Sequence, residues 1–232
     1  MPYFGYYWDP TYVLVIIAML LSMFASFGVN ATFNKYKKQR TVRGITGADA
    51  ARRVLDMNGL QHIRIERVAG NLTDHYDPKA GVIRLSDATY ADSSVAAVGV
   101  AAHEAGHAVQ HAVGYAPIKI RNSIVPVVNI GNALSMPLFL IGLLLNMFVL
   151  AYLGVLLFSL TLVFQLVTLP VEFNASRRAI AILDSSMMLY EDEIKPAKKV
   201  LKAAAMTYVA AVAATALQLL RFLVILGGRR DD

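Results

Sequence analysis

The sequence predicts a mainly α-helical integral membrane protein with about four transmembrane helices and a small α+β domain that carries an HExxH helix. Composition is the first reason: the chain has 232 residues, 56% of them hydrophobic, and a mean hydropathy of +0.50. That is too apolar for an ordinary soluble domain of this size. The second reason is that the apolar residues form long segments without formal charge, each long enough to cross a bilayer. The third is the pattern His-Glu-x-x-His at 103–107, which is typical of a metal site on a helix.

The first transmembrane helix is expected within residues 1–34. No charged residue occurs from Pro10 to Asn34, and nearly all side chains from Thr11 to Val29 are apolar. Residues 1–9 form an aromatic collar without the basic leader of a cleaved signal peptide. We therefore expect this segment to anchor the protein rather than to be removed.

A transmembrane hairpin is expected over residues 122–171. Between Arg121 and Glu172 lie fifty residues without a formal charge, about twice what one spanning helix needs. The likeliest reversal lies within Asn146 to Gly154, where the residues near the middle of the segment are polar, interfacial or permissive of a turn. This segment supplies the second and third transmembrane helices.

The fourth transmembrane helix and a C-terminal tail are expected within residues 203–232. The apolar stretch from Ala203 to Leu226 is interrupted by Arg221, whose long side chain could snorkel to an interface. Few ionisable residues lie in the spans, which argues against a transporter.

Basic residues beside the span ends predict the orientation. Five of them follow the first apolar segment: Lys35, Lys37, Lys38, Arg40 and Arg43. We therefore expect residues 35–121 and 172–202 in the cytoplasm, in a multi-pass protein of the inner or plasma membrane whose active site faces the cytoplasm. This topology accounts for the net charge of +6, so nucleic acid is not an expected partner. The lack of cysteine excludes a disulfide scaffold.

A small helix and sheet are expected between the first span and the HExxH motif. Thr46 is a good N-cap for a helix that ends at Asn58-Gly59. Residues 63–68 alternate like a strand, and residues 72–76 and 82–85 could pair as a hairpin. An exposed edge of such a sheet could accept an extended peptide as an added strand.

The HExxH motif lies on an expected helix from Ala96 to Val113. His103 and His107 are four residues apart and can direct their rings at one metal ion. Glu104 lies next to the open coordination position, where it could remove a proton from the attacking water. The plain alternative is a helix with two surface histidines. Ligand type favours zinc, although Mn or Co could occupy the same site in vitro.

Catalytic zinc usually has three protein ligands, so a third must come from elsewhere. His111 is about 12 Å along the helix from His103, too far to share an ion. Glu172 directly follows the hairpin and returns to the same side of the membrane; alternatively, it is a solvated carboxylate at a helix start. Weaker candidates are His62, His75, Asp184 and Glu191.

Three segments carry a resemblance to a known family: 101–108 around the motif, 72–78 before it and 170–179 after it. Across almost its whole length, the chain resembles the YugP-type neutral zinc metallopeptidases of bacterial membranes. It is distantly similar to the HtpX and CAAX prenyl protease group of membrane gluzincins. In that group two membrane helices separate HExxH from a helix bearing the third zinc ligand, a glutamate in the pattern Glu-x-x-Ala-Asp.

The resemblance implies a zincin-like cytoplasmic region with Glu172 as the third zinc ligand. Ser176 departs from the pattern, because the wider group has an aspartate there that orients a zinc histidine. A hydroxyl could still bond that ring but would polarise it less, and Asp184 could substitute. Residues with chemistry suited to stabilising the transition state are His75, Tyr76, Arg177 and Arg178. Alternatively, the arginines anchor the membrane boundary, and His75 and Tyr76 support the hairpin.

The function expected from the sequence is a membrane zinc endopeptidase that acts in membrane protein quality control or processing. Its expected partners are a protein or peptide substrate and the lipid bilayer, with a membrane-protein partner or a homo-oligomer as further options. Two other functions fit: a non-proteolytic, zinc-stabilised adaptor or scaffold, which a fourth protein ligand would favour, and a hydrolase of non-peptide amides or esters.

Overall fold

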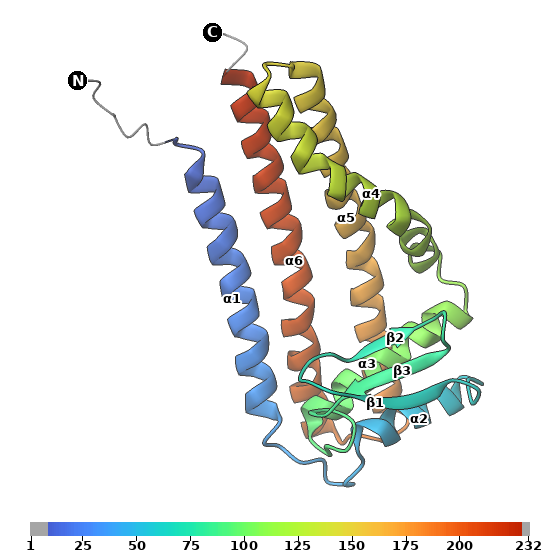
Figure 1. Ribbon diagram of the computed structural model, residues 1–232. Coiled ribbons are helices and arrows are strands. Elements are labelled where there is room, and N and C mark those ends of the chain that lie inside the picture. The colour runs from blue at the N-terminus through green and yellow to red at the C-terminus, as the bar shows by residue number, and fades with distance from the viewer. Residues whose placement is uncertain (1–8, 229–232) are drawn as a thin grey trace. The chain divides into compact units, whose positions relative to one another are not determined.

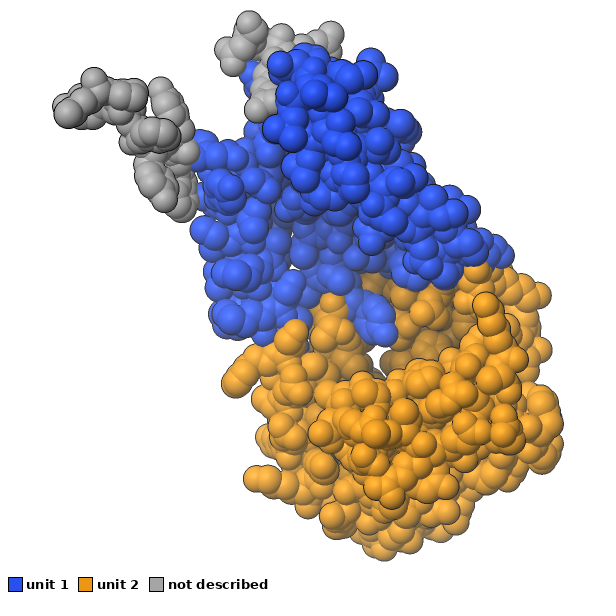
Figure 2. Space-filling view, in the orientation of Figure 1, with its two compact units in different colours: residues 1–25, 123–166, 208–232 blue, residues 26–122, 167–207 orange. Residues whose placement is uncertain are grey.

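The computed structural model describes residues 9–228, so the predicted aromatic collar at residues 1–9 lies outside the described part except for Asp9. The chain divides into two compact units, shown in different colours in Figure 2. Unit 1 contains residues 1–25, 123–166 and 208–232, and unit 2 contains residues 26–122 and 167–207.

The chain is mostly helical, with one small sheet (Figure 1). The elements in order are α1 (Tyr12–Tyr36), α2 (Gly47–Met57), β1 (Arg64–Val68), β2 (His75–Asp77), β3 (Val82–Ser86), α3 (Val95–Ala112), α4 (Ala116–Leu144), α5 (Phe148–Ser185) and α6 (Glu191–Gly228). Within residues 9–228, four helices are long and apolar enough to cross a membrane: α1, α4, α5 and α6. The predicted number of spans is therefore confirmed.

Unit 1 contains the predicted hairpin, in which three residues join α4 to α5. Asn146 in this turn has φ 53°, a left-handed conformation that asparagine tolerates better than most residues. Gly154 lies directly against α4, because a Cβ atom there would be 2.7 Å from the Ser135 carbonyl oxygen. The reversal is thus at the start of the predicted range, and glycine lets the two helices approach closely.

Arg221 of α6 is held by the beginning of α1 within unit 1. Its guanidinium donates a hydrogen bond to Thr11 Oγ1 at 3.2 Å and lies 3.8 Å from Asp9 Oδ2. It also stacks over the Tyr12 ring, 4.7 Å from the centroid. Protein groups therefore bind the guanidinium of the one arginine in the last apolar stretch, in addition to the ability of its long side chain to extend toward an interface.

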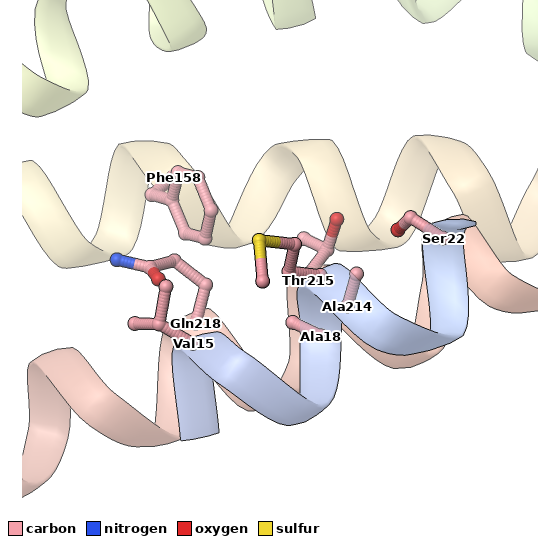
Figure 3. Close-up of a pocket in the computed structure, with 8 residues that line it drawn as sticks. Val15, Ala18, Ser22, Phe158, Ala214, Thr215 and Gln218 are labelled. Atoms are coloured by element: carbon pink, nitrogen blue, oxygen red, sulfur yellow. The ribbon is translucent and has the colours of Figure 1, made fainter. Parts of the chain in front are cut away.

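A cavity of about 350 Å³ lies among the apolar parts of α1, α5 and α6 in unit 1. Figure 3 shows Phe158 of α5 facing Val15 of α1 and Gln218 of α6, with Ser22 further along. Its walls are mainly apolar, and its polar side chains are Ser22, Thr215 and Gln218.

The sheet of unit 2 has the strand order β1-β3-β2. β2 and β3 form the predicted hairpin, in which Tyr76 pairs with Ile83. β1 pairs with β3 in parallel, with Ile65 opposite Ile83, which the sequence did not indicate. Ile83 and Leu85 are fully buried beneath α2 and α3 and form part of one hydrophobic core. The sheet and α2 therefore support α3 from one side.

Helix α2 begins where the sequence predicted. Thr46 accepts a hydrogen bond from the Asp49 amide at 3.2 Å, and the Asp49 carboxylate accepts one from the Thr46 amide at 2.9 Å. This capping box satisfies two amide groups that a helix start leaves free.

Helices α5 and α6 continue beyond the ends of their charge-free segments. α5 runs unbroken through Pro170 and Glu172 to Ser185, and α6 begins at Glu191, well before the apolar stretch at Ala203. A change from apolar to charged residues indicates where a helix leaves an apolar environment, but the backbone can remain helical there. As a result, Glu172 is in the middle of a helix rather than at a helix start.

Candidate metal centre

Helix α3 is packed into unit 2 on nearly all sides. Ser94 caps its N-terminus by accepting from the Ala97 amide at 3.2 Å. Its many alanines and glycines leave little side-chain bulk, so neighbouring backbones can approach closely, and most of the helix is buried. His103 and His107 lie one turn apart on α3 and meet Glu172 of α5.

Three ligand atoms converge at this point. His103 Nε2 lies 3.3 Å from Glu172 Oε2, and His107 Nε2 lies 3.6 Å from the same oxygen. All three potential ligand atoms lie within 4.8 Å of one another. In a tetrahedral zinc site with bonds near 2.0 Å, ligand atoms are about 3.3 Å apart. These three residues therefore fit a zinc ion and can bind one.

The outward-facing nitrogens of both histidines have hydrogen-bond partners. His107 Nδ1 donates to Gln110 Oε1 at 3.0 Å, and His103 Nδ1 lies 3.1 Å from the Ser176 hydroxyl. Bonding at Nδ1 leaves Nε2 of each ring free to bind a metal and fixes the ring orientation. The Ser176 hydroxyl thus contacts the ring of a histidine of the HExxH motif, as its chemistry allows.

Gln110 connects α3 to α5 beneath His107. The Gln110 side chain is fully buried and donates from Nε2 to the Val171 carbonyl at 2.8 Å and to Asn174 Oδ1 at 3.0 Å. Arg178 Nε donates to the same Asn174 oxygen at 2.8 Å. Sequence reasoning missed Gln110 and Asn174. Their spacing in the sequence could have identified them, because Gln110 is one helical turn after His107 and Asn174 is two residues after Glu172.

The charges around His107 favour a cation at this position. Burial opposes protonation of the His107 ring, but the hydrogen bond to Glu172 and the nearby charges of Glu104 and Glu172 raise its pKa above the usual value. A site that attracts a proton in this way also attracts a metal cation. Glu104 itself is 9% exposed and lies outside the group of three ligand atoms.

Gly106 allows the close approach of α3 and α5 at the metal centre. A Cβ atom at this position would lie 2.9 Å from the Ala175 carbonyl oxygen on α5. We expect Gly106→Ala to destabilise unit 2 by about 1–3 kcal/mol through overpacking and to weaken zinc binding by displacing α5. Thermal unfolding and zinc competition titration measure both effects.

Gly99 is the matched control on the same helix. Its added Cβ would meet Ala197 at an ordinary 3.7 Å. Gly99→Ala should therefore be neutral or stabilising by up to ~1 kcal/mol, as alanine is the better helix former. Equal losses in both variants would contradict a specific close contact at Gly106.

Removal of the Gln110 amide should weaken zinc binding without removing a ligand. We expect Gln110→Ala to lower zinc affinity about 10–100-fold, because His107 loses the group that orients it. Asn58→Ala is the control, since Asn58 also donates an amide to a backbone carbonyl, that of Val54, but lies away from the site. Unchanged zinc affinity in Gln110→Ala would show that α3 alone orients His107.

The other histidine and tyrosine candidates lie outside the group of ligand atoms. His111 is exposed; its Nε2 is 3.0 Å from the Asn122 amide nitrogen, and its ring is 6.0 Å from that of Tyr76. His75 is exposed, and its Nδ1 lies 2.8 Å from the Thr73 carbonyl oxygen. Tyr76 is half-buried on β2, where burial raises the pKa of its hydroxyl.

The two arginines after Glu172 have different surroundings. Arg178 is part of the Asn174 network described above, whereas Arg177 is exposed and lines a cavity of about 470 Å³ between α5 and α6. Three weaker candidates are exposed and outside the group of ligand atoms: His62, Asp184 and Glu191. Ser176 itself, rather than Asp184, contacts the zinc-site histidine.

Comparisons with known proteins agree with this site. Residues 11–227 match the family described as "Putative neutral zinc metallopeptidase". The chain is 48% identical over 219 residues to the "Putative membrane protease YugP" of Bacillus subtilis (strain 168), covering 94% of this chain and 97% of that protein. No solved structure matches the chain.

Proposed function

The chain belongs to the neutral zinc metallopeptidase family, and we propose that it is a multi-pass membrane endopeptidase that hydrolyses peptide bonds in proteins or peptides. The observation that carries this proposal is the convergence of His103, His107 and Glu172 on one point. Three protein ligands are the number that a catalytic zinc site uses, because the fourth position must stay open for water or substrate.

Each residue of the centre has a defined part in the proposed reaction. His103, His107 and Glu172 would hold the ion, while Ser176 and Gln110 orient the two rings. Zinc, when bound, lowers the pKa of a water molecule and polarises the substrate carbonyl. Glu104 takes the proton from the attacking water and passes it to the amine that leaves.

Strand β2 is the proposed platform for the substrate. β2 is an edge strand: within the described residues it pairs with β3 on one side and with no strand on the other. It also packs against α3, and the Tyr76 ring approaches that of His111. An extended peptide added at this edge would be held through its backbone, which favours substrates recognised by conformation rather than by one side chain.

We place the active site at the cytoplasmic face of the inner or plasma membrane. The support is the distribution of basic residues, since five follow the apolar part of α1 and others follow Glu172 and lie in the first part of α6. A site at this position would serve membrane protein quality control or processing.

Cleavage of unfolded casein by the purified protein tests the proposed function. We expect internal cleavage products by mass spectrometry, inhibition by 1,10-phenanthroline, and no inhibition by 1,7-phenanthroline, an isomer that cannot chelate zinc. Release of single terminal residues would contradict an endopeptidase. Bound zinc without cleavage of casein or of a membrane-protein substrate would favour the scaffold instead.

A further inference from the structure

A second cavity in unit 2 lies between α1 and α6, and none of the three potential metal ligands lines it. Its volume is about 430 Å³. It is lined by Thr32, Lys35 and Tyr36 of α1 and by Lys199, Lys202 and Met206 of α6. Three lysines from two helices therefore line one cavity, together with a threonine and a tyrosine that carry hydroxyl groups.

The three lysines of this cavity have no acidic partner. Within residues 9–228, none of Lys35, Lys199 and Lys202 has a carboxylate oxygen within 4.0 Å, although Lys35 lies 5.5 Å from the Tyr36 ring centroid. Elsewhere in unit 2, arginines with acidic partners are common: Arg40, Arg52, Arg64, Arg67 and Arg84. An anion in the cavity would supply the negative charge that the protein itself does not place beside these lysines.

Both helices change from apolar to basic at this cavity. In α1, the charge-free segment ends at Lys35, and in α6 the basic first part ends at Lys202, where a charge-free stretch begins. Thr32 and Met206 lie on the apolar side of this change. In a membrane, such a change marks the level of the lipid headgroups, where basic side chains meet anionic phosphates.

We propose that this cavity binds the phosphate of an anionic phospholipid. The lysines contact the phosphate, and an acyl chain of the lipid follows the apolar residues Ala203 and Met206. The proposal rests on the membrane location of α1 and α6 and does not depend on peptidase activity.

Native mass spectrometry of the delipidated protein in detergent measures this binding. Phosphatidylglycerol should bind more tightly than phosphatidylcholine, which has the same phosphate but no net charge. The triple variant Lys35→Gln, Lys199→Gln, Lys202→Gln should lose about 100-fold in affinity for phosphatidylglycerol. The same triple change to Arg should keep the binding, which separates the loss of charge from any loss of folding.

Three other lysines provide a matched control: Lys37→Gln, Lys38→Gln and Lys195→Gln remove the same charge close by without lining the cavity. This control should bind phosphatidylglycerol like the wild type. Equal losses in both Gln triples would overturn the proposal and leave only general attraction to a basic surface. Equal binding of phosphatidylglycerol and phosphatidylcholine would also overturn the proposal, because the site would then not select an anionic lipid. Equal binding of glycerol phosphate and phosphatidylglycerol would overturn it as well, because the acyl chains would then contribute nothing.

Discussion

Replacement of Glu104 by glutamine is expected to lower kcat/KM for casein about 10²–10⁴-fold while one zinc remains bound to each chain. Glutamine has nearly the same shape but cannot accept the proton from water, and general base catalysis contributes a factor of this size. His103, His107 and Glu172, the proposed metal ligands, are unchanged. The measurement is the cleavage rate together with the zinc content of the same sample.

The control for this variant is Glu66→Gln on β1, which removes an acidic group that is not part of the metal centre. Glu66 pairs with Arg64 at 2.9 Å and with Arg84 at 3.4 Å but not with any of the metal ligands, so its replacement should leave cleavage unchanged. A Glu104→Gln protein that keeps more than a tenth of the wild-type rate would show that another group is the base. A variant without zinc would show that Glu104 is needed to hold the ion.

Replacement of Glu172 by alanine is expected to remove zinc from the protein at concentrations that saturate the wild type. Structural zinc sites with four ligands bind with about 10–16 kcal/mol, so one ligand supplies about 2.5–4 kcal/mol, or a factor of about 10²–10³ in affinity. The variant should also be inactive, because two histidines alone hold the ion too weakly. Zinc content after dialysis and competition with a chelator of known affinity measure this effect.

Glu193→Ala is a closely matched control for Glu172→Ala. Glu193 is also a buried glutamate in unit 2, but its carboxylate accepts hydrogen bonds from the Val42 and Tyr190 amides, both at 2.8 Å. Its loss should destabilise the fold, since the Val42 and Tyr190 amides lose their acceptor, and should leave one zinc bound. If both variants lose zinc equally, the effect of Glu172 is on folding and not on coordination.

The metal centre could be predicted largely from the sequence. Its histidines are close together along the chain, and the position of its glutamate follows from the order of the membrane helices. The two histidines are four residues apart on one helix, so local geometry brings them together. Glu172 joins them from 65 residues further on, and its assignment depended on the length of the charge-free segment and on a family resemblance. The hydrogen bond between His103 Nδ1 and the Ser176 hydroxyl likewise follows once α5 is helical, because Ser176 lies one turn after Glu172.

The features that the sequence did not predict depend on long-range packing. The Gln110 network exists because α3 and α5 approach at Gly106, and no local pattern indicates which polar side chain will lie between them. The parallel pairing of β1 with β3 is also a tertiary feature, since residues 63–68 alternate equally well for either direction. The sequence does not predict the unbroken course of α5 past Glu172, because a loss of apolar character marks the end of an apolar segment but not the end of a helix.

The zinc K-edge X-ray absorption spectrum of the wild-type protein, purified without added metal, tests the central claim most directly. We predict one zinc per chain in a shell of four nitrogen and oxygen ligands at about 2.0–2.1 Å, with the outer-shell scattering of two imidazole rings. A shell with one imidazole, or with three or more, would contradict the assignment of His103, His107 and Glu172 as the ligands. Absence of zinc from the active protein would contradict the account as a whole.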